Sequence, residues 1–300
     1  MARKARAKKA PRQRPQWLEG FDFRGAGVFA LVLAGLGATL YGIAAVHARA
    51  SDLLADKPAT AEIVWPRLPG AQETWLGETL REQIVARVEA QLAGTALDAV
   101  ALARVGESLA ASGWFDKAPR VERTSDGVIR VRGVWRQPAC AVRAGARDYA
   151  VDWRGRPFPV DYPAGASGLR VILGASGGPP LGRTGELDVM NAWPGDDVAA
   201  GLGLLAPLLR EPFAGQVAGV DVAGYFAQGQ LAIVTDKGSR VVWGGRFGEF
   251  IPGEASSDDK LARLRSLAGN VQFGNRIDMG QKRLEIFDER YFALDLTGPP

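Results

Sequence analysis

The side chains that most often perform catalysis or bind metals are scarce in this chain. Its 300 residues include one histidine, His47, and one cysteine, Cys140. A nucleophile–histidine–carboxylate site needs a histidine beside the nucleophile, and a structural zinc site needs four ligands drawn mostly from Cys and His. The sequence therefore predicts no catalytic triad, no metal site and no bound cofactor. The single thiol is interpreted as a buried one.

Carboxylates are the remaining candidates for acid–base chemistry, and two adjacent pairs stand out, Asp196–Asp197 and Asp258–Asp259. Both pairs stand next to predicted helix starts, where the helix dipole favours acidic residues. The glycine-rich segment 174–182 lacks the Gly-Lys-Ser/Thr sequence that cradles a phosphate. We therefore expect a protein that is not an enzyme and has no small-molecule substrate.

An uncharged stretch runs from Gly25 to Val46 and follows a basic N-terminus. As a helix it would be about 33 Å long, enough for the roughly 30 Å hydrocarbon core of a bilayer. Because Lys and Arg stay on the cytoplasmic side, the pattern predicts a cytoplasmic tail at 1–24, a transmembrane helix at 25–47 and a linker at 48–60. The body would then be extracytoplasmic. A signal peptide cleaved near Ala48–Ala50 is the alternative.

Small residues recur at every fourth position of this stretch, namely Ala26, Ala30, Ala34, Ala38 and Gly42. At that spacing they share one helix face, where a second backbone can approach closely. The spacing predicts a packing face for a partner helix, and an alanine-rich span without a partner is the alternative. The basic tail is interpreted as an orientation signal, although a short basic run can also bind nucleic acid or anionic lipid. We expect no nucleic-acid partner.

Residues 61–137 follow the order strand, helix, helix, strand, strand. Apolar residues spaced by three or four mark one helix from Leu80 to Leu92 and another from Leu102 to Leu109. Alternation over 128–136 marks a strand, after a Ser-Asp-Gly turn at 125–127. Its other face carries three basic side chains that are interpreted as solvated: Arg130, Arg132 and Arg136. The pattern predicts a small α+β module.

The region 138–300 is predicted to be mostly antiparallel β structure with one or two helices. Strands are expected at 139–142, 149–151, 217–222, 230–235, 240–243 and 284–287. Helices are expected at 199–209 and 258–267, where apolar residues follow a helical period. The predicted fold class is therefore α+β, with a transmembrane helix, a small β-α-α-β-β module and a larger β domain.

Several motifs carry more information than the composition does. They are Trp114-Phe115, Val121-Glu122-Arg123, Pro138-Ala139-Cys140, Val151-Asp152-Trp153-Arg154-Gly155 with Phe158, the hairpin Leu231–Gly238 with Val242-Trp243-Gly244, and the start of a helix at Lys260-Leu261. In order and spacing they resemble the FtsQ/DivIB family of bacterial cell-division proteins. The resemblance implies a POTRA-like domain at 61–137 and a C-terminal β domain at 138–300.

The resemblance also implies a function. Family members are non-catalytic scaffolds, anchored by one span in the inner membrane with a cytoplasmic N-terminus. They act at the division site, where they bind other bitopic division proteins. A partner segment usually adds as a strand to a C-terminal sheet edge. On this basis we expect contacts at Leu284, Ile286, Phe287, Tyr291 and Phe292, each of which is equally suited to the core. Trp114 and Phe115 are interpreted as core residues.

Three points stay open in the sequence. The family's Asp-Leu-Arg-Tyr-like strand has two candidates, Ile277–Gly280 and Asp288–Tyr291. POTRA-like modules also serve in secretion and envelope biogenesis, so a membrane-anchored assembly subunit of such a system is an alternative function. A membrane-anchored wall hydrolase that uses one carboxylate pair is a further alternative.

Overall fold

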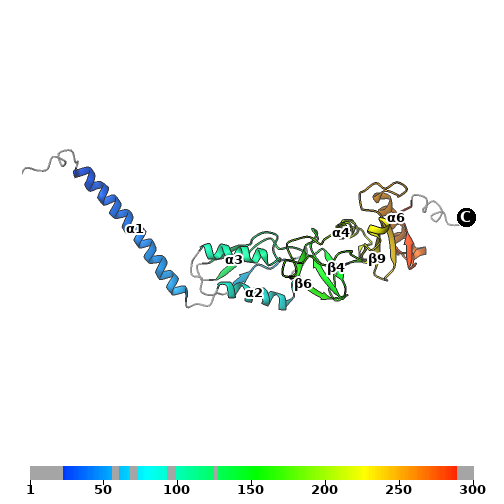
Figure 1. Cartoon of the computed structure of the whole chain (residues 1–300), viewed down its shortest axis with the longest axis horizontal. Helices are drawn as coiled ribbons and strands as arrows, with labels where there is room; N and C mark the ends of the chain where they lie inside the picture. The colour runs from blue at the N-terminus through cyan, green and yellow to red at the C-terminus, as the bar shows by residue number, and fades with distance from the viewer. Residues whose placement is uncertain (1–22, 56–60, 68–72, 93–98, 125–127, 289–300) are drawn as a thin grey trace, which may run out of the picture.

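The chain has an α+β fold, with two sheets that follow one another along the long axis of the molecule (Figure 1). The structure is a computed structural model and describes residues 23–55, 61–67, 73–92, 99–124 and 128–288. A long helix, α1 (Phe23–Ala55), precedes the two sheets in the chain. The smaller sheet belongs to an N-terminal module, residues 61–137, and the larger one to a C-terminal module, residues 138–288.

The prediction of a transmembrane helix at 25–47 is wrong. Among the residues that the structure describes, no helix has both the length and the apolarity needed to cross a membrane. Within the uncharged part of α1, Gly35, Gly37, Thr39 and Gly42 contribute little apolar surface.

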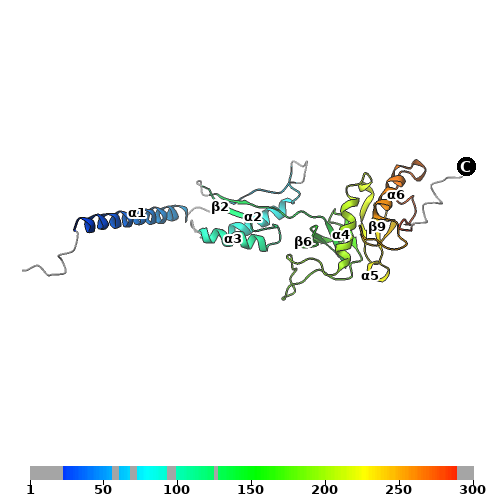
Figure 2. The same ribbon diagram turned by 90° about the horizontal axis from the view of Figure 1, so that it is seen from above.

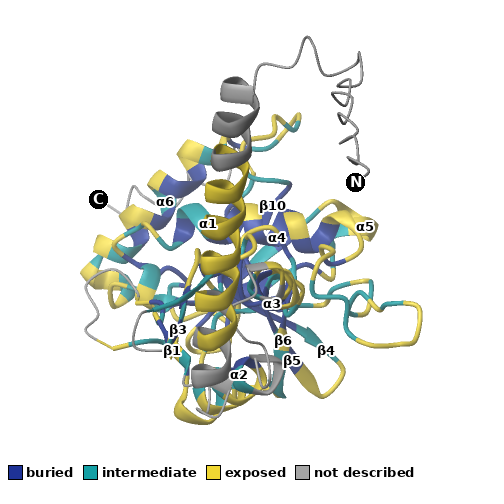
Figure 3. Cartoon of the chain, turned by 90° about the vertical axis from the view of Figure 1, so that its left-hand side faces the viewer, coloured by how far each residue is buried: buried dark blue, intermediate teal, exposed yellow. Residues whose placement is uncertain are grey.

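The predicted packing face falls on the same helix. Ala34, Ala38 and Gly42 are exposed, and the side chains of Ala26 and Ala30 lie outside the described residues. A Cβ built on Gly42 would contact nothing within 4 Å. In Figure 3 this stretch of α1 carries the colour of exposed residues, whereas many residues in the two modules carry the colour of buried ones.

The N-terminal module contains β1 (Ala61–Ile63), α2 (Glu78–Leu92), α3 (Ala99–Ala111), β2 (Arg120–Arg123) and β3 (Ile129–Arg132). Its strands lie in the order β1-β3-β2, with β1 parallel and β2 antiparallel to β3. The predicted order of strand, helix, helix, strand, strand is thus observed. Trp114 and Phe115 are buried, as expected, in the cluster that fills this module.

The C-terminal module contains one sheet of eight strands in the order β11-β10-β9-β8-β7-β4-β5-β6. The strands are β4 (Cys140–Ala144), β5 (Arg147–Val151), β6 (Pro157–Pro163), β7 (Val171–Leu173), β8 (Val217–Asp221), β9 (Leu231–Thr235), β10 (Arg240–Gly244) and β11 (Arg283–Glu285). Three of the pairings, β10–β11, β4–β7 and β7–β8, are parallel. The sheet is therefore mixed, and β6 and β7 were not predicted.

Three α-helices accompany this sheet, α4 (Asp196–Leu208), the single turn α5 (Tyr225–Gln228) and α6 (Ser257–Gly269). Two 3-10 turns lie at Ala214–Gln216 and Val271–Phe273. Helix α4 packs on β7 and β8, and leucines of α4 and α6 share one core with Ile233 and Trp243. Figure 2 shows α4 on the upper surface of the module, between β6 and β9.

A buried arginine ties the two modules together. The side chain of Arg136 is 2% exposed, whereas the sequence analysis placed it on a solvated face. Its Nε donates to Asp152 at 2.9 Å, and its two terminal nitrogens donate to the carbonyls of Gly113, Arg156, Pro157 and Val189. The guanidinium lies 4.5 Å from the ring centre of Phe158. These bonds use all five N–H groups of the side chain.

Burial lowers the pKa of Arg136, and the neighbouring Asp152 opposes that effect. Asp152 also accepts bonds from the backbone N–H groups of Arg154 and Arg156, which fixes the turn after β5. Arg156 then reaches Asp116 of the N-terminal module at 2.8 Å. By contrast Arg130 pairs with Glu62 at the surface, and Arg132 is exposed.

Candidate functional site

The residues expected to contact a partner do not form an exposed patch. Leu284 and Ile286 are 2% and 0% exposed and belong to the core beneath α6. Phe287 is half-buried. Tyr291 and Phe292 lie outside the described residues. Leu284 and Ile286 therefore support the edge strand from inside and present no surface of their own.

The strand that carries them ends the larger sheet. Among the described residues, β11 pairs only with β10. The carbonyl of Lys282 accepts from Arg240 at 2.9 Å, and the N–H of Ile286 donates to Val242 at 3.1 Å. Since the backbone groups of successive strand residues point to opposite sides, those of Arg283 and Glu285 face away from β10. This outer edge of β11 is the candidate site.

The edge is short. The carbonyl of Phe287 accepts from the N–H of Ala255 at 2.8 Å, and Asp288 forms a bridge with Glu254. Arg263 donates from one nitrogen to the carbonyls of Ile286 and Asp288, both at 2.7 Å. The loop and α6 thus close the edge after residue 286, and the backbone groups of Arg283 and Glu285 have no strand partner among the described residues.

The side chains along the edge are charged and exposed. Arg283 donates to Glu285 at 3.0 Å, with side-chain exposures of 60% and 48%. Arg240 lies opposite Arg283 in the register and pairs with Asp221. Lys282 is exposed beside them. Charged side chains such as these keep an open edge from pairing indiscriminately.

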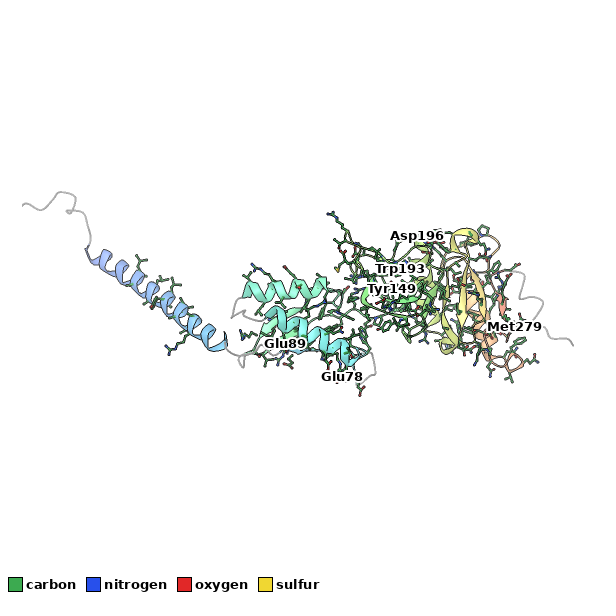
Figure 4. All side chains as sticks on the ribbon, turned by 60° about the horizontal axis from the view of Figure 1, so that its bottom comes forward. Glu78, Glu89, Tyr149, Trp193, Asp196 and Met279 are labelled. Carbon is green, nitrogen blue, oxygen red and sulfur yellow. The ribbon has the colours of Figure 1, made fainter. Side chains whose placement is uncertain are left out.

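A buried carboxylate holds the turn that leads into β11. Asp278 is 1% exposed and accepts bonds from Arg276, from the hydroxyl of Thr235 on β9 and from the N–H of Gly280. Residues 277–280 form a turn with Met279 at a φ of 53°, so this candidate for the Asp-Leu-Arg-Tyr-like strand is not a strand. Figure 4 shows Met279 in the C-terminal module, far from Glu89 of α2.

Asp278 makes the stability of this end of the sheet depend on pH. Hydrogen bonds from Arg276 hold the pKa of the Asp278 carboxyl well below its usual 3.8. A carboxyl with a depressed pKa contributes stability above the unfolded value of about 3.9, and the contribution is lost as pH falls below it. We expect Asp278→Asn to lower the free energy of unfolding by about 3 kcal/mol at pH 7. At pH 3 the difference in unfolding free energy between the variant and the wild type should be smaller. Urea denaturation at both pH values measures this, and an equal cost at both would contradict it.

The carboxylate pairs lie where the sequence analysis put them, in the first turns of α4 and α6. Asp197 is buried and accepts from the N–H of Ser176 at 2.6 Å, which ties a loop to α4. Asp259 donates its N–H to the Ser256 hydroxyl that caps α6. Cys140 is buried on β4, and burial raises the pKa of its thiol.

Sequence reasoning missed the two residues that form the open edge. Arg283-Leu284-Glu285-Ile286 alternates polar and apolar side chains, which is the signal of a strand buried on one face. That signal assigns Leu284 and Ile286 to the core and Arg283 and Glu285 to the outside. The expected contact residues come instead from the family resemblance, and two of them, Leu284 and Ile286, are buried in the core.

In comparisons with known proteins, no family model matches the chain and no curated protein matches its sequence. The FtsQ/DivIB resemblance therefore depends on the motifs quoted above.

Proposed function

We propose that this chain is a non-catalytic scaffold of the cell-division machinery, of the FtsQ/DivIB type, which binds another division protein by strand addition. The observation that carries the proposal is the open edge of β11, with the backbone groups of Arg283 and Glu285 pointing away from the sheet. An added strand completes these hydrogen bonds, and its side chains give specificity. The motifs at 112–158 and 231–261 support the choice of family.

The physical test is to remove one edge donor without disturbing the pairing with β10. Glu285→Pro deletes an N–H that faces outward, and proline is tolerated on the outer side of an edge strand. We expect crosslinked partner recovered from cells to fall about tenfold, the equivalent of one or two lost hydrogen bonds. Glu285→Ala is the matched control, because it keeps the N–H and should keep the partner. Equal recovery with both variants would exclude the edge as the binding site.

The cellular test is localisation. We expect a tagged full-length chain to concentrate at the division site, and Glu285→Pro to weaken that concentration more than Glu285→Ala. A uniform distribution in dividing cells would contradict the division role. Co-purification with secretion or envelope-assembly components would instead favour the alternative function.

A further inference from the structure

The C-terminal module has a second surface feature, distant in sequence from the β11 edge. An open groove of about 600 Å³ runs along α4. One wall is the turn 153–155, whose Trp153 is 47% exposed although most large apolar side chains here are buried. The floor includes Ala199, Gly203 and Ala206 of α4. Figure 4 shows Trp193, which also lines the groove, next to Tyr149, with Asp196 nearby.

The groove suits a helix and not a strand. Its long side is a helix face, whose backbone groups are already bonded within α4, so no sheet edge is available to an extended segment. A helix satisfies its own backbone and needs only side-chain packing. No side chain covers Gly203, because a Cβ built there would contact nothing within 4 Å. The smooth surface allows a second helix axis to approach to about 8 Å.

The spacing of the outer residues of α4 identifies the helix that fits. Asp196, Ala199, Gly203 and Ala206 of α4 are separated by three, four and three residues, which is the repeat of a coiled-coil seam, and Arg210 follows in the turn after the helix ends at Leu208. The first turn of the helix carries the negative charge of Asp196, and the positive charge of Arg210 lies just beyond its C-terminal end. A second copy laid antiparallel places each Arg210 beside the partner's Asp196. The seam is therefore complementary to itself about a two-fold axis at Gly203.

Both charges are accessible for this pairing. The Asp196 side chain is 78% exposed and lies 3.3 Å from Arg246 of its own chain, a contact at the surface. Arg210 is exposed, and in the described part of the chain no carboxylate lies within 4.0 Å of its guanidinium nitrogens. A parallel arrangement would place like charges together at both ends of the seam.

We infer that two copies of this chain associate through antiparallel packing of α4 on α4, with Trp153 of each copy covering the flank of the partner's helix. This association is independent of the β11 edge, and Glu285→Pro leaves it unchanged.

Cysteine crosslinking of the full chain tests the geometry. The native Cys140 is 0% exposed, so an introduced cysteine is the only reactive one among the described residues. Gly203→Cys lies at the two-fold axis and should form a disulfide-linked dimer under mild oxidation, because the two Cα atoms fall within about 7 Å. Asp196→Cys should link to Arg210→Cys when the two variants are mixed. Neither of them should link to itself, because an antiparallel pair separates like ends by about 20 Å.

Control cysteine variants and charge-reversal variants separate specific dimerisation from random collision. Ala103→Cys on the exposed side of α3 measures random collision, and the inference is overturned if it links as readily as Gly203→Cys. Self-linking of Asp196→Cys would show a parallel pair, and an adduct with a different protein would show another occupant. Arg210→Asp should weaken Gly203→Cys dimerisation about tenfold, and adding Asp196→Arg should restore it. If adding Asp196→Arg does not restore dimerisation, the proposed pairing of Asp196 with Arg210 is wrong.

Discussion

Replacing Arg136 by alanine should lower the free energy of unfolding by about 3–5 kcal/mol. The change leaves the carboxylate of Asp152, buried at 8% side-chain exposure, with only one of its two arginine partners, Arg156, and it removes a donor from four carbonyls. Arg136→Lys keeps the charge but cannot replace five N–H groups with three. We therefore expect lysine to recover less than half of the loss.

The measurement is urea denaturation of the full chain, together with hydrogen exchange at 152–157. Arg132→Ala is the control, because Arg132 is exposed on the same strand and its loss should cost less than about 0.5 kcal/mol. Exchange should rise at the turn after β5 and at the end of α3, where Gly113 lies. A similar cost for both variants would mean that the network contributes nothing beyond an ordinary surface arginine.

The second large effect concerns the centre of the sheet. Gly219 on β8 lies opposite Val171 on β7 in a parallel pair. A Cβ on Gly219 would lie 1.9 Å from the carbonyl oxygen of Val171, and this atom belongs to the backbone and cannot rotate away. Gly219→Ala must therefore separate the two strands or break their hydrogen bonds. We expect a loss of about 4 kcal/mol or more in unfolding free energy.

Gly203→Ala provides the opposite control. Its Cβ has open space within the helix, and alanine is favoured over glycine there by roughly 0.5–1 kcal/mol. The midpoints of urea unfolding for the two variants should move in opposite directions. If Gly219→Ala shifts stability by less than about 1 kcal/mol, β7 and β8 do not approach as closely as described.

Arg136 illustrates why burial could not be predicted from the strand pattern. Alternation placed it with Arg130 and Arg132 on one face, and for those two residues the interpretation as a polar face holds. But Arg136 lies beyond the end of β3 at Arg132, where the alternation no longer applies. Its partners come from 113, 152–157 and 189. Only the packing of those distant segments removes the guanidinium from water.

The sheet topology also contains pairings that the local sequence predicts and pairings that it does not. Hairpins such as β9–β10 are predictable because a turn joins neighbours in the chain, here at 236–238. The parallel pairs β7–β8 and β10–β11 bring together strands separated by long connections, which no local pattern specifies. The domain predicted to be mostly antiparallel is therefore a mixed sheet, with four antiparallel and three parallel pairings.

The sequence by itself determined the positions of α2, α3, α4 and α6, most of the strands, and the position of both aspartate pairs in the first turns of helices. Each of these depends on residues within one or two turns of one another. The tertiary structure decided that Leu284 and Ile286 are core, that Arg283 and Glu285 are the open edge, and that Arg136 is buried. Those outcomes depend on which surfaces meet, and contacts between residues far apart in the chain leave no periodic trace in the sequence.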